Sequence, residues 1–342
     1  MTKPVVALTL GDPAGIGPEI ALKALRKRSL LREIKLVFIG DLFVLKRAAH
    51  RVPSVPLPPD FATFEEIAAS GTYPCLLNLQ HPHFAFSFGR VNARCGQLSI
   101  DYLNTAIRLA QAKAVDGIVT GPIHKQAWAA AGSKFSGHTE MLAAATRTRE
   151  FAMAFSAKNF LTVLLSTHLP LKNALTLLSG PLLERKIHLT VRALEELGSK
   201  HPRLAVAGVN PHAGEGGLLG DEEIKIFLPT IKKCRRHGLD VSGPYSADTV
   251  YLRAAGGEFD AVLAPYHDQA MLAVKTLSFG HATNITLGLP FVRTSVDHGT
   301  AFDIAGKGLA NESALVDAIQ KCRELIRARQ GNRPKSPERN SC

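Results

Sequence analysis

Three histidines stand at equivalent places in this chain of 342 residues, each about three positions beyond a short apolar run. A single histidine at such a place is usually a structural or surface residue. Three of them favour a metal site, because imidazole suits zinc and similar divalent ions and three protein ligands leave a coordination position open for substrate. The three are His168 after run 160–165, His212 after run 204–209 and His267 after run 261–264.

Two carboxylates lie near these histidines in the sequence. Asp248 and Asp268 are candidates for further ligands or for hydrogen-bond partners of the imidazoles. The chain has no His-Glu-x-x-His motif and no Cys-x-x-Cys pair, which disfavours a zincin-type protease and a cysteine-based zinc site.

A cationic and polar set follows the last histidine. Lys275, Asn284 and Arg293 supply an amine, an amide and a guanidinium within the next twenty-odd positions. Because the arginine fork can bind a carboxylate or phosphate through two hydrogen bonds, this set suits a small anionic substrate. The alternative is a loop with ordinary surface charges. Earlier in the chain, Thr139 follows His138 at a point where a threonine is most often a helix cap.

The elements that must position these residues alternate between β-type apolar runs and helical segments. This alternation predicts an α/β fold with largely parallel strands. In such sheets ligands gather beyond the carboxyl ends of the strands, so we expect the polar clusters to converge on one cleft. The expected strands are 5–10, 34–40, 117–120, 160–165, 204–209 and 261–264, and the expected helices are 98–116, 184–197 and 221–237, with a kink or break at Pro229.

The loop Gly11-Asp-Pro-Ala-Gly-Ile-Gly17 follows the first run and permits a tight strand-to-helix turn, with Pro18 at a favourable first helical position. It matches neither the Gly-x-Gly-x-x-Gly fingerprint nor a P-loop. A plain turn and a role for Asp12 near a ligand are both compatible with this pattern.

Composition places the chain among soluble globular proteins, because 46% of residues are hydrophobic and 20% are charged. Its length of 342 residues predicts one large or two medium domains. No apolar run approaches the ~20 residues of a membrane helix, and the N-terminus enters a strand with no signal peptide. Five scattered cysteines fit a reducing compartment. We expect a cytoplasmic protein that does not contact membranes.

The net charge of +12 (41 Lys and Arg minus 29 Asp and Glu) raises the question of nucleic-acid binding. Seven basic and two acidic residues from position 321 onward account for +5 of it, and residues 331–342 are predicted to be a disordered basic tail. Only 6% of residues are aromatic, and no basic stretch is interleaved with aromatics. A diffuse positive field suits a small anionic substrate better than a nucleic acid.

Seven motifs in order resemble those of the 4-hydroxythreonine-4-phosphate dehydrogenase family of pyridoxal phosphate biosynthesis, and the likeness extends from about residue 4 to residue 328. The motifs are Gly11-Asp-Pro-Ala-Gly-Ile-Gly-Pro-Glu19, Thr120-Gly-Pro-Ile-His-Lys125, Gly137-His-Thr-Glu140, Thr167-His-Leu-Pro-Leu171, Asn210-Pro-His-Ala-Gly-Glu215, Tyr266-His-Asp-Gln269 and Arg293-Thr-Ser-Val-Asp-His-Gly-Thr300.

The resemblance implies one divalent ion (zinc, magnesium or cobalt) on His168, His212 and His267, in agreement with the set argued from the strand ends. It implies two α/β lobes around a cleft, as in isocitrate and isopropylmalate dehydrogenases. It also implies binding of NAD (or NADP) without a Rossmann fingerprint and a homodimer with shared active sites. The substrate contacts that it implies are His138, Thr139, Lys275, Asn284 and Arg293.

On this basis we expect residues 1–130 with 290–330 to form the first lobe. Residues 131–289 would form the second lobe, which carries most metal and substrate residues and the dimer interface. The implied substrate is a small phosphorylated amino acid, 4-phosphohydroxy-L-threonine. Its hydroxyl would be oxidised by NAD, and the resulting 3-oxo acid would lose carbon dioxide to give 3-amino-2-oxopropyl phosphate.

Proton transfer in this reaction has three candidates, His138, Asp248 and Asp268, and the sequence does not choose among them. The nearest alternative is a paralogue that oxidises a related phosphorylated sugar acid, such as 4-phospho-threonate or 4-phospho-erythronate, or a dihydrodiol. A metal-dependent hydrolase or aldolase is a further alternative, and a nucleic-acid-binding protein is the non-enzyme one.

Overall fold

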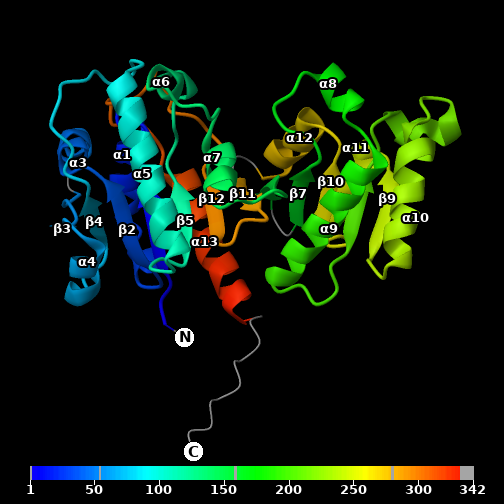
Figure 1. The fold of residues 1–342 in the computed structure, drawn as a ribbon, viewed down its shortest axis with the longest axis horizontal. Coiled ribbons are helices and arrows are strands. Elements are labelled where there is room, and N and C mark those ends of the chain that lie inside the picture. The colour runs from blue at the N-terminus through cyan, green and yellow to red at the C-terminus, as the bar shows by residue number, and fades with distance from the viewer. Residues whose placement is uncertain (1, 54, 158–159, 279–280, 332–342) are drawn as a thin grey trace, which may run out of the picture.

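Twelve strands form one sheet that runs the length of the molecule in the computed structural model, which describes residues 2–331 except 54, 158–159 and 279–280 (Figure 1). The expected tail therefore lies outside the described residues, apart from Gly331. The strand order is β3-β4-β2-β1-β5-β12-β11-β6-β7-β10-β8-β9. The first six strands, in this order, are Asp60–Phe61, Cys75–Asn78, Lys35–Gly40, Val5–Thr9, Gly117–Thr120 and Val292–Ser295. The other six are Thr283–Leu287, Ala152–Ala157, Phe160–Leu164, Ala261–Ala264, Leu204–Ala207 and Val241–Tyr245.

Most neighbouring strands are parallel, as the sequence predicts, but the centre of the sheet is not. Strand β11 is antiparallel to both β12 and β6, and β6 is antiparallel to β7. The parallel strands β7, β10, β8 and β9 consequently run opposite to the parallel strands of the first half. Sequence analysis did not find β6, β11 and β12, because none of them is a long apolar run set off by turn residues.

Helices cover the sheet on both faces. In the first half they are α1 (Gly17–Ala24), α2 (Arg28–Leu31), α3 (Leu42–Ala49), α4 (Phe64–Ser70), α5 (Ala93–Gln111), α6 (Lys125–Ala130), α7 (His138–Ala145) and α13 (Ser313–Gly331). In the second half they are α8 (Leu171–Thr176), α9 (Gly180–Glu196), α10 (Leu228–Arg236), α11 (Ala247–Ala255) and α12 (His267–Ser278). A 3-10 segment, η1 (Pro211–Gly217), and a π segment, η2 (Glu223–Phe227), precede α10.

The expected helices are present with shifted ends. Helix α5 begins earlier than predicted because the Asn92 side chain caps it by accepting a hydrogen bond from the Cys95 N–H at 3.1 Å. The helix expected over 221–237 is divided, as its proline predicts: a π turn ends at Phe227, and α10 begins with Pro229 in its first turn, where a missing N–H costs nothing. Among the described residues no helix is long and apolar enough to cross a membrane.

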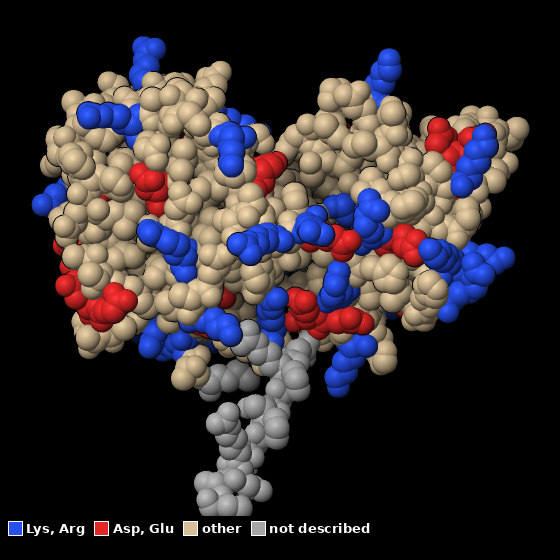
Figure 2. All heavy atoms as spheres, in the orientation of Figure 1, with Lys and Arg blue, Asp and Glu red and all other residues tan. Residues whose placement is uncertain are grey.

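The core is continuous across the two halves of the sheet. Central strands such as β1, β5 and β7 bury nearly every side chain, as strands covered by helices on both faces must. A notch between the two halves is visible at the top of the molecule in Figure 2. Lysine and arginine side chains are scattered over this face rather than gathered in one stripe.

Candidate active site in the interlobe cavity

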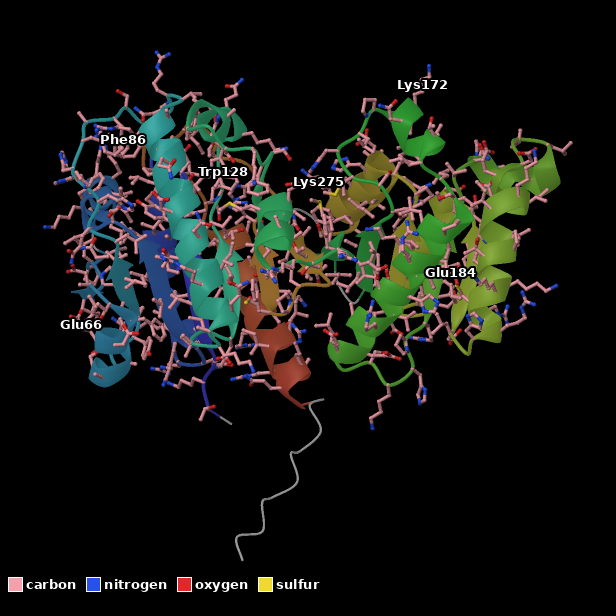
Figure 3. All side chains as sticks on the ribbon, in the orientation of Figure 1. Glu66, Phe86, Trp128, Lys172, Glu184 and Lys275 are labelled. Carbon is pink, nitrogen blue, oxygen red and sulfur yellow. The ribbon has the colours of Figure 1, made fainter. Side chains whose placement is uncertain are left out.

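A cavity of about 420 Å³ lies between the two halves of the sheet. Its walls come from the carboxyl ends of β5 and β12 on one side, from α7 and the central strands β6 and β11, and from the residues after β7 and β10 on the other side. Seven of the residues predicted for the site line it: His138, Thr139, His168, His267, Lys275, Asn284 and Arg293. The expected convergence on one cleft is thus found for these seven residues. Figure 3 shows Lys275 on α12 at the gap between the halves.

Arg293 is the buried charge at the base of this cavity. It lies on β12 with 2% of its surface exposed, and its Nη2 and Nη1 donate hydrogen bonds to Thr120 Oγ1 at 2.7 Å and to Thr286 Oγ1 at 3.0 Å. Burial lowers the guanidinium pKa to about 10, an effect that the carboxylate of Glu140 partly offsets. Arg293 therefore remains charged at neutral pH, held by two neutral hydroxyls and, in the part of the chain that the structure describes, without a hydrogen-bonded carboxylate.

Three buried polar atoms among the cavity-lining residues have no hydrogen-bond partner within the described ranges of the chain. They are Arg293 Nε, His138 Nε2 and Asn284 Oδ1. Buried polar atoms are normally paired, so unpaired ones need an explanation such as an absent ligand or water. A guanidinium N–H donor, an imidazole nitrogen and an amide oxygen in one cavity are suited to a polar, anionic small molecule.

His138 is the first residue of α7 and packs edge-on against Trp128, with ring centroids 5.6 Å apart. Burial, and then the positive charge of Arg293, hold the imidazole pKa well below its usual value. The ring is consequently neutral at physiological pH. Thr139 follows it and is 8% exposed, but no side-chain cap bond is made at this helix start, so its expected role as a cap is not observed.

His168 and His267 form an imidazole pair on the opposite wall. Their ring centroids are 5.3 Å apart, because β7 and β10 are parallel neighbours and each histidine follows its strand at a similar distance. Asp268 Oδ1 lies 2.7 Å from His267 Nδ1, which leaves Nε2 free as a ligand atom. Partial burial lowers the pKa of His168, with further lowering by Lys125 and His267 and an opposing effect of Glu140. Neutral imidazoles are the form that binds a divalent metal.

His212, the third predicted metal ligand, does not line the cavity. Its side chain is 67% exposed and its Nδ1 lies 3.1 Å from Glu215 Oε2. Within one chain, in the part that the structure describes, the three predicted imidazoles are not close enough together to share an ion. The reason is topological: His212 follows β8, which is one strand farther from the cavity than β10.

The loop that carries His212 has an unusual backbone. Residues 212–216 all have positive φ angles between 43° and 83°, a region that non-glycine residues rarely occupy. Glu223 supports the start of the loop, since its Oε1 accepts the N–H groups of Val209 and Asn210 at 2.7 and 2.8 Å. Sustained left-handed backbone of this kind is found mainly where surrounding structure enforces it, often at functional sites.

The two predicted carboxylates also lie outside the cavity lining. Asp268 is 81% exposed. Among the described residues, its side chain makes one hydrogen-bond contact, with Nδ1 of His267. Asp248 lies in the first turn of α11, where its Oδ1 accepts a hydrogen bond from Ser246 Oγ at 2.5 Å. In one chain neither carboxylate lines the cavity that holds His138.

Sequence reasoning assigned no role to four further charged or titratable residues that line the cavity. They are Lys125, Glu140, Asp297 and His298. All four belong to the motifs Thr120–Lys125, Gly137–Glu140 and Arg293–Thr300, and Lys125 and Asp297 follow strand ends as the predicted histidines do. Their position in these motifs is the sequence signal that could have identified them as cavity residues.

Asp12 belongs to the tight turn after β1. Gly11 has φ +74°, and a Cβ there would lie 2.3 Å from the Pro122 carbonyl oxygen, so the turn requires glycine. Asp12 is fully buried; its Oδ1 accepts the Ala14 N–H at 2.9 Å, while Oδ2 has no partner. Burial raises the carboxyl pKa to about 6. The turn is thus explained, and Asp12 does not line the cavity.

Comparison with known proteins identifies relatives over nearly the whole chain. The family model described as pyridoxal phosphate biosynthetic protein PdxA matches residues 32–322. A 4-hydroxythreonine-4-phosphate dehydrogenase of Beijerinckia indica is 43% identical over 320 residues, which cover 94% of this chain and 94% of that protein. A D-threonate 4-phosphate dehydrogenase of Salmonella typhimurium is 42% identical over 332 residues, which cover 95% and 100%. The crystal structure of a 4-hydroxythreonine-4-phosphate dehydrogenase from Klebsiella pneumoniae superposes with a TM-score of 0.85 at 38% identity, covering 95% and 98%.

Proposed function

The chain belongs to the PdxA family of pyridoxal phosphate biosynthetic proteins, and from that premise we propose that it is an NAD-dependent, divalent-metal-dependent dehydrogenase acting on 4-phosphohydroxy-L-threonine. The 3-oxo acid formed by oxidation of the substrate hydroxyl then loses carbon dioxide and gives 3-amino-2-oxopropyl phosphate. One observation carries the proposal: a single cavity combines a buried guanidinium, a lysine and neutral imidazoles.

The charges of the cavity match a substrate with a phosphate and a carboxylate. Arg293 stays charged while its neighbours are neutral threonine hydroxyls, so an anion would find an incompletely paired guanidinium there. Lys275 adds a second cation on α12. Thr139 and Asn284 supply polar contacts that position the substrate between the two cations.

The residues present fit a divalent metal. His168 and His267 offer two close imidazoles, the first neutral and the second oriented by Asp268. When bound there, a divalent ion supplies Lewis acidity that lowers the pKa of a substrate hydroxyl. We propose that His212 completes this set in the assembled protein, as the left-handed loop that carries it is held rigidly by Glu223.

Assembly as a homodimer with shared active sites is part of the proposal. Large apolar side chains beside the cavity are exposed in the single chain, which is the kind of surface that a second copy covers. They lie on the loop before α8, on α8 and its end, and on α12: Leu169, Leu171, Leu175, Leu177 and Leu272. We keep the division into lobes, residues 1–130 with 290–330 and residues 131–289, as an expectation. The positions of β12 in the first half of the sheet and of β11 in the second support it, whereas α7 belongs to residues 131–289 but packs against α5 of the first half.

Among the three candidates for proton transfer, His138 is favoured. Its ring is neutral and lines the cavity, whereas Asp248 and Asp268 do not line it in one chain. A neutral imidazole beside the substrate can accept the hydroxyl proton as hydride leaves the carbinol carbon for NAD. The sequence has no Gly-x-Gly-x-x-Gly fingerprint, so NAD (or NADP) would be bound without a Rossmann motif.

A second candidate substrate is D-threonate 4-phosphate, because the Salmonella typhimurium protein with that named activity is as similar as the Beijerinckia indica one. Both compounds carry a phosphate and a carboxylate, and they differ in having an amino group or a hydroxyl at the second carbon. The buried Asn284 Oδ1 can accept a hydrogen bond from either group, so the cavity does not separate them.

The test is an assay of NADH formation with each of the two compounds, with and without a chelator. The proposal expects NADH from the amino compound, a higher kcat/KM for it than for the threonate, and loss of turnover with the chelator. The reverse preference would assign the second substrate. Substrate consumption without NADH would instead indicate a metal-dependent hydrolase or aldolase.

A further inference from the structure

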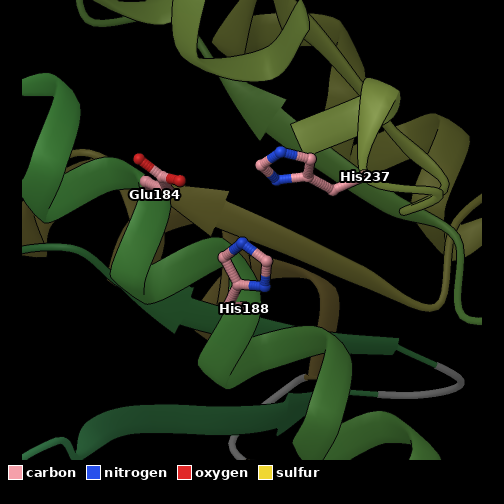
Figure 4. Close-up of side chains that lie close together, drawn as sticks. All are labelled: Glu184, His188 and His237. Carbon is pink, nitrogen blue, oxygen red and sulfur yellow. The ribbon is translucent and has the colours of Figure 1, made fainter. Parts of the chain in front are cut away.

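A second group of metal-binding side chains lies on the outer helices of the second half of the sheet. Glu184 and His188 are on α9, and His237 directly follows α10. One ligand atom from each of the three lies within 4.8 Å of the other two. Figure 4 shows the carboxylate and both imidazoles around one common space. None of the three lines the interlobe cavity, and Figure 3 shows Glu184 on a different part of the molecule from Lys275.

The helices hold these three positions together through the core. Glu184 and His188 are one turn apart, at i and i+4, so they share the same face of α9. The adjacent face of that helix buries Leu183 and Ile187. Helix α10 packs against α9 and buries Ile231 and Cys234 in the same core, which places its C-terminal His237 beside the α9 pair.

We propose that Glu184, His188 and His237 bind a divalent ion of the zinc type. Two imidazole nitrogens and one carboxylate oxygen are donors that suit Zn²⁺, Co²⁺ or Ni²⁺ better than Mg²⁺ or Ca²⁺, which prefer oxygen ligands. Three protein ligands leave one position for water. Tetrahedral bonds of ~2.0–2.2 Å place ligand atoms about 3.4 Å apart, so a bound ion would draw these three atoms somewhat closer together than the 4.8 Å within which they now lie.

Lys233 is the competitor for this site. Its Nζ donates a hydrogen bond of 2.8 Å to Glu184 Oε2, and this bond lowers the pKa of Glu184, an effect that desolvation partly opposes. The carboxylate is therefore ionised and ready to act as a ligand. A bound ion must share or displace the lysine, so Lys233 weakens the site without abolishing it. The bound ion would tie α9 to α10 and stabilise this half of the molecule.

The test measures Zn²⁺ binding to the metal-free full-length protein by equilibrium dialysis at neutral pH. A host variant, His168→Ala with His267→Ala, removes the cavity imidazoles so that the remaining binding reports on the helix site. The host is expected to bind one Zn²⁺ per chain. His188→Ala or His237→Ala in this host should weaken binding by at least about tenfold, since even outer partners of metal ligands contribute 10- to 100-fold.

Two matched variants make the result decisive. His201→Ala removes an exposed histidine outside the group and should leave Zn²⁺ affinity unchanged. Lys233→Gln should tighten binding because it removes the competitor. The proposal is overturned if the host binds no Zn²⁺, or if His188→Ala behaves like His201→Ala. If the host does not fold, the same readout is the loss of one Zn²⁺ equivalent from His188→Ala in the otherwise wild-type enzyme, with dehydrogenase activity retained.

Discussion

The interlobe cavity and the helix site place similar side chains in opposite physical settings. In the cavity the polar groups come from strand ends far apart in the sequence, and several are buried without a partner. At the helix site the groups come from two helices, are partly or fully exposed, and include a carboxylate already paired with a lysine. Burial lowers the pKa values of His138 and Arg293 in the cavity, whereas the hydrogen bond from Lys233 lowers the pKa of Glu184 at the helix site.

This difference explains why the two regions should bind their ligands with different specificity. A buried guanidinium that is paired only with neutral hydroxyls gains strongly from binding an anion, which favours one class of substrate. At the helix site a bound ion would replace Lys233 as the partner of Glu184, so the net affinity of this site for the ion is modest. We therefore expect substitutions in the cavity to have large effects on activity and substitutions at the helix site to have small effects that appear mainly with added metal.

The largest effect is expected from Arg293→Ala. Removing one partner of a buried charged interaction typically costs 2–5 kcal/mol, so kcat/KM for the phosphorylated substrate should fall by roughly 30- to several thousand-fold. Steady-state NADH formation measures this loss. The matched control is Arg192→Ala, because Arg192 is 58% exposed and pairs with Glu150 at the surface, where the expected effect is less than about threefold. Equal effects of the two variants would remove the distinction between buried and exposed charges.

The next contrast is between the histidines of the two regions. His168→Ala should lower kcat by at least about a hundredfold, because a metal ligand of the proposed reaction is lost. His188→Ala, at the helix site, should retain full activity. Inductively coupled plasma analysis of bound metal beside the activity assay separates the two sites. If His188→Ala were as inactive as His168→Ala, the helix site would have to be part of the catalytic machinery.

The two regions also differ in how far they could be predicted from the sequence. Strand ends can be found in a sequence from apolar runs, and the carboxyl edge of a parallel sheet brings them together, which is why His168 and His267 were expected to meet. His212 was expected there too, but the order of strands along a sheet is not readable from run lengths, and β8 lies outside β10. Its part in the metal set stays a prediction.

The helix site was missed for a different physical reason. Glu184 and His188 at helical spacing are typical of a solvent-exposed helix face, and such pairs usually have no ligand. Their meeting with His237 depends on the packing of α9 against α10, which follows from core contacts rather than from any local pattern. The α/β class was confirmed, whereas the antiparallel strands β6 and β11 were not anticipated.

An intermediate effect is expected on stability from Asp12→Asn in the first half of the sheet. The buried Asp12 carboxyl has its pKa raised from 3.8 to about 6. An acid with a raised folded-state pKa stabilises the fold fully below its unfolded value and loses that contribution as the pH rises through the folded value. Between pH of about 4 and 6 the wild-type protein should therefore lose up to about 3 kcal/mol relative to Asp12→Asn.

Urea unfolding at a series of pH values measures the Asp12 effect. Asp303→Asn is the control, because Asp303 is exposed and its charge stays in water in both states. If Asp12→Asn instead lost activity without gaining stability at neutral pH, the functional reading of the Gly11–Gly17 loop would prevail over the plain turn. That outcome would mean that the Gly11–Gly17 loop contributes to activity together with the cavity residues.

The smallest effect is expected from Lys233→Gln, which tests the exposed side of the comparison. Without metal the variant loses a surface ion pair with Glu184, so unfolding free energy should fall by at most about 1 kcal/mol. Lys225→Gln is the matched control, because Lys225 also pairs with a carboxylate, Asp221, on an exposed helical segment but is not part of the helix site.

Adding Zn²⁺ should then separate these two lysine variants. Stabilisation by a ligand rises as RT ln(1 + [L]/Kd), so a tighter site gives a larger increase in melting temperature at the same Zn²⁺ concentration. Lys233→Gln should gain more than the wild-type protein, and Lys225→Gln should gain the same as the wild-type protein. Calorimetry at several Zn²⁺ concentrations measures both gains. Identical responses of all three proteins would mean that Lys233 does not compete for Glu184, and that added zinc stabilises the chain from elsewhere.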